Sequence, residues 1–197
     1  MKKLFWGFFF VFFNFHLSIN QYTLQLLPDF VGYLLLFQGA KELETENRYF
    51  KNIQPFTVGM AVYTAILWAG ELLGLMGDRG MYHQTLTGIL ALISTAVALY
   101  ISWVLVQGVL EMESRRAADL NGGTLYQWWK GLAVLRIAGW LLGRMASLTN
   151  AAAMAMLATA LTVASIVLNV LYLIAWWRAA KAWEALPPLG ISEEEIE

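Results

Sequence analysis

Long apolar stretches, separated by short polar segments, dominate the chain. Four of these stretches are long enough to cross a hydrocarbon core about 30 Å thick, which takes roughly 20 residues in a helix. They predict helices near 53–76, 85–113, 125–147 and 150–184. Helices are favoured over other structures because a bilayer offers no water to the unpaired backbone of an open strand.

The N-terminal region is more mixed in character. An apolar run at 4–13 is followed by a more polar segment, and we expect a first helix near 4–19. Two lysines before an apolar run also describe a signal peptide, but no small-x-small cleavage site follows, so we expect the helix to be retained. A second helix is expected near 28–47, because Pro28 suits a first helical turn and Asp29 suits the positive end of the helix dipole.

The distribution of Lys and Arg predicts the direction of these helices. Positive residues near helix ends stay in the cytoplasm, and with the N-terminus inside only Arg79 and Arg144 fall on the outer side. The cytoplasmic set is Lys2, Lys3, Lys41, Arg48, Lys51, Arg115, Arg116, Lys130, Arg178 and Lys181. The expected fold class is all-α, a polytopic transmembrane helical bundle of about six spans with both termini cytoplasmic. Residues 1–186 would form this single domain, and 187–197 a disordered acidic tail.

Tryptophans cluster at the predicted cytoplasmic helix ends. An indole at a membrane surface places its ring in the apolar layer and its N–H among the headgroups. We therefore expect an anchoring belt made of Trp6, Trp128, Trp129, Trp176, Trp177 and Trp183.

Composition supports a membrane location and narrows the function. Hydrophobic residues make up 59% of the chain and charged residues 14%, with a mean hydropathy of +0.56, which is outside the usual soluble range. A net charge of −1 gives no basic field for nucleic acid. The chain has no cysteine, which excludes disulfides, thiol catalysis and thiolate metal sites. No zinc-protease, nucleophile-elbow, phosphate-loop or dinucleotide motif occurs, so we expect no enzyme activity, metal or cofactor.

Two predicted helices share a nine-residue echo, AGELLGLMG at 69–77 and AGWLLGRMA at 138–146. The echo fits either a duplication of helix pairs or the reuse of one packing arrangement, and we favour packing. Small residues four apart let two helix backbones approach closely where lipid gives no hydrophobic drive. The expected packing positions are Gly70, Gly74, Gly139 and Gly143.

Ionisable residues inside the predicted helices are the strongest candidates for function. Each costs about 2.5 to 3.5 kcal/mol at the bilayer centre on insertion scales, so it needs a partner, a wet cavity or a role. Arg136 falls near mid-membrane without a carboxylate at its depth, whereas Glu71 is better matched to Arg144. Such an arginine is either a buried structural group or part of an anion-binding cavity, since guanidinium holds carboxylate or phosphate with paired hydrogen bonds. The candidate intramembrane polar site is Asp29, Glu71, Arg136, Arg144 and Asn169.

A short N-terminal segment resembles a known family. Ile19 and Asn20 precede LPDFVGY at 27–33, which is similar to the LPDFxGY signature of an uncharacterised multi-pass membrane family of Gram-positive bacteria. The resemblance covers 16–51, with Val31 a conservative departure. It implies a polytopic membrane protein and supplies no activity. It also makes the segment after Leu27 a stronger candidate for a functional turn, beside its interpretation as ordinary helix capping.

Two functions fit these features. The first, which we favour, is a small carrier or channel-like protein for an anionic solute, with Arg136, Glu71 and Asp29 lining a polar path. The second is a non-catalytic membrane scaffold or accessory subunit of a larger complex, which holds a membrane protein partner or a second copy of the chain. Both predict a multi-pass protein of the plasma (cytoplasmic) membrane, in contact with the lipid bilayer and not with nucleic acid.

Overall fold

The computed structural model of the chain describes residues 1–12, 16–19, 22–25, 28–73, 80–149 and 152–186, with side chains except at 16–19, 22–25, 71, 80–87, 147–149 and 155. Its elements in chain order are α1 (Lys2–Phe12), β1 (His16–Ile19), β2 (Tyr22–Gln25), α2 (Asp29–Glu42), α3 (Arg48–Leu72), α4 (Gly80–Arg116), α5 (Gly122–Thr149) and α6 (Ala152–Glu184). The helical bundle expected from the sequence is confirmed. The predicted tail at 187–197 lies outside the described residues.

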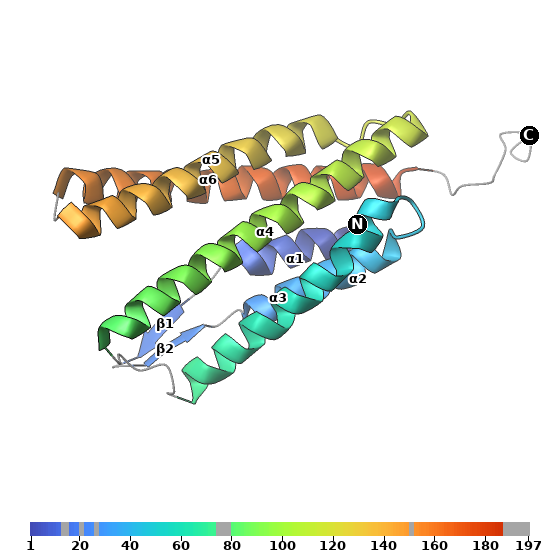
Figure 1. Cartoon of the computed structure of the whole chain (residues 1–197). Coiled ribbons are helices and arrows are strands. Elements are labelled where there is room, and N and C mark those ends of the chain that lie inside the picture. The colour runs from blue at the N-terminus through green and yellow to red at the C-terminus, as the bar shows by residue number, and fades with distance from the viewer. Residues whose placement is uncertain (13–15, 20–21, 26–27, 74–79, 150–151, 187–197) are drawn as a thin grey trace, which may run out of the picture.

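The helices close into a ring (Figure 1). Each helix packs against the next one along the chain, and α1 packs against α6. α5 and α6 form an antiparallel pair on one side, α1, α2 and α3 lie together on the other, and α4 runs diagonally between the two groups. The candidate site lies among α1 to α5 of this arrangement.

The first helix is shorter than expected. α1 ends at Phe12, and β1 and β2 form an antiparallel hairpin in which Ile19 lies opposite Tyr22. The apolar run ends at this point, and the segment after it mixes polar residues with β-branched and aromatic ones, which favour extended backbone. The prediction of a helix over 4–19 is therefore wrong beyond Phe12, whereas the all-α fold class is confirmed, with one short hairpin between α1 and α2.

The boundary between the second and third helices also differs from the expectation. α2 ends at Glu42 and α3 begins at Arg48, each five residues before the predicted boundary. Asn47 explains the early start of α3, because its Oδ1 accepts the backbone N–H of Tyr49 at 3.1 Å as an N-cap does. The same side chain donates through Nδ2 to the carbonyl of Gly108 at 2.8 Å. One buried asparagine therefore starts α3 and joins it to α4.

Among the described residues, three helices are long and apolar enough to cross a membrane. These segments are Arg48–Gly70, Gly88–Arg116 and Ala152–Glu184. α1 and α2 have 11 and 14 residues, which is fewer than the roughly 20 that a full span requires. α5 has 28 residues but carries several cationic side chains. The count of about six spans stays a prediction.

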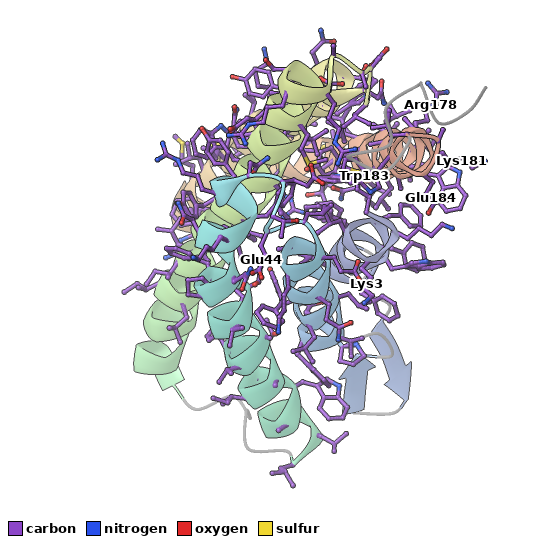
Figure 2. All side chains as sticks on the ribbon, turned by 90° about the vertical axis from the view of Figure 1, so that its right-hand side faces the viewer. Lys3, Glu44, Arg178, Lys181, Trp183 and Glu184 are labelled. Atoms are coloured by element: carbon purple, nitrogen blue, oxygen red, sulfur yellow. The ribbon has the colours of Figure 1, made fainter. Side chains whose placement is uncertain are left out.

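Ion pairs hold one end of the bundle together, two of them between helices and one between α4 and the turn that follows α2. This ionic end is defined by the pairs Lys2–Glu184, Lys3–Glu42 and Arg116–Glu46, whose N–O distances are 2.9, 2.6 and 2.6 Å. Figure 2 looks at this end, where Lys3 and Glu184 project from α1 and α6. Residues 2 and 184 thus lie at the same end of the bundle. The side of the membrane that this end occupies stays a prediction.

Two tryptophans of the expected belt pack against other helices, one fully and one partly buried. Trp176 is fully buried in the core, and Trp129 donates its indole N–H to Ser102 Oγ on α4 at 3.0 Å. Trp6 and Trp177 are 46% and 37% exposed, as a belt requires. The belt is wrong for Trp176, because Trp176 and Trp177 are adjacent and adjacent helical residues point in different directions.

The closest helix contact is made by glycines of α1 and α2. A Cβ built on Gly7 would lie 2.7 Å from Leu36, one on Gly32 would lie 2.8 Å from the Gly7 carbonyl, and one on Gly39 would lie 2.7 Å from Leu4. These distances are too short for any side chain larger than hydrogen. Only glycine therefore lets these two backbones approach so closely.

The glycines predicted to pack closely on α5 do not do so. A Cβ on Gly139 would reach its nearest neighbour only at 4.0 Å, and a Cβ on Gly143 would meet nothing within 4 Å. The prediction is wrong because Gly143 lies on the exposed face of α5. Gly70 lies near the end of α3, and Gly74 lies outside the described residues.

Candidate functional site

A polar cavity of about 310 Å³, open to the outside of the bundle, has side chains from α1 to α5 in its wall. Phe12 contributes from α1. The polar lining residues are Asp29 and Tyr33 from α2, Tyr63 and Thr64 from α3, Ser94 and Thr95 from α4, and Arg136 from α5. The volume is at the small end of the range for ligand sites in proteins.

Arg136 lies at the middle of α5, about 20 Å from either end. It follows Trp129 and Leu132 on one helix face, and Leu132 is 3% exposed, so this face points into the ring. The guanidinium carbon lies 5.0 Å from the centre of the Phe12 ring, a cation–π contact. Among the described residues, the guanidinium has no hydrogen-bond or ion-pair partner. Its N–H donors are therefore available to the cavity.

α2 brings a carboxylate and a phenol to the same cavity. The helix starts at Asp29 because Pro28 holds an extended N-cap conformation, with φ −72° and ψ 127°. Tyr33 follows one turn later on the same side, and it is 4% exposed. Asp29 occupies the first helical turn, where the dipole favours a negative charge. Asp29 can therefore stabilise the start of α2 and line the cavity at the same time.

The hydroxyl groups of α3 and α4 present acceptors to the cavity. Thr64 donates its own proton to the carbonyl of Met60 at 2.7 Å, and Ser94 and Thr95 donate theirs to the carbonyl of Ala91 at 3.0 and 2.8 Å. With these protons committed, the hydroxyl oxygens retain lone pairs. Donation to a molecule in the cavity would come from Arg136 and the two tyrosines that line it.

The other predicted site residues do not line this cavity. Arg144 lies against α4, where a Cβ built on Gly88 would be 3.7 Å from its Nη1. Asn169 is 9% exposed on α6, and its Oδ1 accepts no hydrogen bond within the described part of the chain. The side chain of Glu71 lies outside the described residues. Of the five predicted residues, the structure brings Asp29 and Arg136 together at the cavity.

The cavity contains polar residues that sequence reasoning did not single out. The spacing of Asp29 and Tyr33, one helical turn apart, was a usable signal for one of them. Hydroxyl residues within apolar helices were a weaker signal, because such side chains satisfy themselves on their own helix backbone. The lining residues missed in this way are Tyr33, Tyr63, Thr64, Ser94 and Thr95.

An apolar groove between α4 and α5 adjoins the cavity. Its volume is about 270 Å³, and its lining residues are Leu92, Thr95, Ala96, Leu99, Arg136, Ile137, Trp140 and Leu141. Arg136 and Thr95 belong to both spaces. Trp140 lies in this groove, whereas the aromatic ring over the guanidinium is that of Phe12. The guanidinium of Arg136 therefore lies between the polar cavity and the apolar groove.

No protein-family model matches the chain, and neither do any of the curated proteins or solved structures compared with it. The resemblance of 16–51 to a membrane family of Gram-positive bacteria stays a prediction. The function is therefore argued from the cavity and its residues.

Proposed function

We propose that this chain is a multi-pass protein of the cytoplasmic membrane that binds a small anionic solute at Arg136 and carries it across the bilayer. The observation that supports this function most directly is the guanidinium of Arg136, which lines the polar cavity and makes no hydrogen bond or ion pair within the described residues. A guanidinium presents five donors in a planar fork, and this fork matches a carboxylate or phosphate group. Tyr33 and Tyr63 add two phenolic donors to the same space.

Large apolar side chains on the outer surface support the membrane location. Ile66, Val134 and Met156 are 63%, 66% and 74% exposed, and they belong to α3, α5 and α6. Soluble monomers rarely expose extended apolar surface. A hydrocarbon environment would cover these side chains without any cost of desolvation.

The ionic end supports a cytoplasmic position for residues 2 and 184. Lysine and arginine near helix ends are retained in the cytoplasm. Lys2, Lys3 and Arg116 all form their ion pairs at this end. This orientation gives the sidedness that the charge distribution predicts.

Asp29 balances the charge of Arg136 in the cavity wall. With both groups ionised, Asp29 and Arg136 add no net formal charge to the middle of the bundle, which lowers the cost of placing the arginine there. An anionic solute would compete with the carboxylate for the field of the guanidinium. We therefore expect Asp29→Asn to raise the affinity for a monoanion several-fold.

The binding step is tested by thermal denaturation of the purified protein in detergent. Acetate, benzoate and inorganic phosphate are compared with chloride at equal ionic strength. A ligand at 100 times its dissociation constant stabilises the folded state by about 2.7 kcal/mol, so specific binding raises the melting temperature. We expect Arg136→Leu to abolish this rise and Arg144→Leu, an exposed arginine on the same helix, to retain it.

An equal rise in Arg136→Leu and the parent would contradict the proposed site. If no anion raises the melting temperature of the parent, the carrier function fails. The scaffold interpretation then gains, because it requires no solute. For an anion that binds, uptake into proteoliposomes separates a carrier from a protein that only binds.

A further inference from the structure

We propose that Arg136 and the α4–α5 groove together form a site for a single-chain amphiphile with a carboxylate head, such as a fatty acid. The head would lie at the guanidinium in the polar cavity, and the acyl chain would lie in the groove. This inference rests on the proposed anion site and names the class of anion that fits it.

The first argument is the position of the guanidinium. Arg136 lines the polar cavity, where Tyr33 and Tyr63 offer further donors, and it also lines the apolar groove. A small hydrophilic anion would use only the first of these spaces. A molecule with a charged head and an apolar tail uses both spaces and leaves no charge in the groove.

The second argument is the shape and chemistry of the groove. Its α4 side runs from Leu92 to Leu99, which corresponds to about 10 Å of helix. Apart from Arg136 and Thr95, its lining side chains are aliphatic or aromatic. Its volume of about 270 Å³ is below the usual range for drug-sized ligands, so it suits one acyl chain rather than two.

The third argument is access from the lipid. Leu92 and Leu141 are 43% and 50% exposed on the outer surface of the bundle, where the proposed membrane location puts lipid. An amphiphile already dissolved in the bilayer could enter the groove sideways, and its charged head would find a counter-charge at Arg136. A polar solute would have to reach the cavity from the aqueous phase.

Tryptophan fluorescence provides the test, because Trp140 lines this groove and bromine atoms on an acyl chain quench a nearby indole. The protein is placed in phosphatidylcholine nanodiscs and titrated with dibromostearic acid or with its methyl ester. We expect the acid to give a saturable quenching component above the linear quenching by bulk lipid. Trp140→Phe should remove that component. Trp103→Phe, in the neighbouring groove on α4, should retain it.

The charge dependence is tested with variants of arginine. Arg136→Leu should weaken the apparent affinity for dibromostearic acid at least tenfold, and Arg144→Leu should leave it unchanged. If Arg136→Leu does not fold, Arg136→Lys and competition by stearic acid against stearyl alcohol answer the same question. Only the acid should displace the probe from the parent protein.

The possible results separate this inference from the proposed function. If acetate or benzoate binds in an Arg136-dependent way while dibromostearic acid shows no Trp140-dependent saturation, the amphiphile site is wrong and the anion site stands. If saturable quenching is equal for the acid and the ester, or equal in Arg136→Leu, the head is not held by the arginine and the inference is overturned. If neither ligand depends on Arg136, both proposals fail.

Discussion

The α1–α2 interface and the α4–α5 interface differ in how closely their helices pack. Between α1 and α2, Gly7, Gly32 and Gly39 bring the two backbones so close that one methyl group on any of them would clash. Between α4 and α5, an apolar groove of about 270 Å³ lies beside Arg136. The first interface has no space for a ligand, whereas the second has space and a charge.

This difference indicates how the fold could combine stability with the proposed binding site. A helix pair in lipid gains its stability from close van der Waals contact, and α1 and α2 have it. The ring can then tolerate a looser interface elsewhere, since α1 also packs against α6 and closes it. Ligand sites commonly lie between the helices of a bundle, and here the looser interface is the one that Arg136 lines.

The largest expected effect comes from comparing a methyl group added at the α1–α2 interface with one added on the exposed face of α5. Gly32→Ala places a Cβ 2.8 Å from the carbonyl of Gly7, and this overpacking should lower the free energy of unfolding by about 3 kcal/mol. Gly143→Ala meets nothing within 4 Å and should raise it by up to about 1 kcal/mol through helix propensity. Thermal denaturation in detergent measures both. Equal destabilisation would mean that α5 packs more closely than described.

The next test compares Arg116, which forms an ion pair, with Arg136, which forms none within the described residues. Arg116 pairs with Glu46 at 2.6 Å, and their side chains are 13% and 15% exposed. Arg116→Leu leaves this carboxylate without its partner and should lower stability by about 2 kcal/mol. Arg136→Leu removes a guanidinium that makes no hydrogen bond or ion pair within the described residues, so the melting temperature should fall by less than in Arg116→Leu, or rise. A large loss in Arg136→Leu would instead indicate a structural arginine.

A smaller effect is expected where the chain passes from α4 to α5. Glu113 Oε1 accepts the backbone N–H groups of Leu120 and Gly122, each at 2.7 Å. Glu113→Ala should lower stability by about 1 kcal/mol, as the loss of a helix cap does. The matched control is Glu111→Gln, which breaks an exposed pair with Arg115 and should change stability by less than about 0.5 kcal/mol. Similar losses would show that Glu113 does not fix this connection.

The smallest expected effect concerns the hydrogen bond across the α4–α5 interface. Trp129 Nε1 donates to Ser102 Oγ at 3.0 Å. Trp129→Phe keeps a ring and removes the donor, so stability should fall by about 0.5 to 1 kcal/mol. Trp128→Phe loses the same area of ring, and no hydrogen bond of Trp128 is recorded in the described residues. A greater loss of stability in Trp128→Phe would contradict a stabilising hydrogen bond from Trp129.

Much of the fold could be predicted because apolar length is a direct signal of a helix. The stretches at 85–113, 125–147 and 150–184 lie almost entirely within α4, α5 and α6. The early start of α3 depends on Asn47 and a carbonyl 61 residues away on α4, which no local pattern contains. The hairpin was not predicted, because its polar, β-branched and aromatic residues directly follow an apolar run that indicates a helix.

The candidate site could be predicted only in part. Arg136 lies in the middle of an apolar stretch, so its position midway along a helix could be predicted from the sequence. Its meeting with Asp29 depends on how α2 and α5 are placed around the ring, and hydropathy carries no such information. The glycines show the same limit: spacing pointed to Gly139 and Gly143, whereas contact is made by Gly7 and Gly32.

The most direct test of the central claim measures whether water reaches the cavity in the membrane. Because the chain has no cysteine, single cysteines can be introduced at Ser94, in the cavity wall, and at Val134, which is 66% exposed on α5. The two variants are treated in native membranes with a membrane-impermeant thiol reagent, and reaction after SDS denaturation confirms that each cysteine is competent.

We expect Ser94→Cys to react in the intact membrane and to be protected by an anion that binds at Arg136, whereas Val134→Cys, facing lipid, stays unreacted until denaturation. Reaction of Val134→Cys together with an inert Ser94→Cys would contradict a lipid-embedded bundle built around a water-accessible polar cavity.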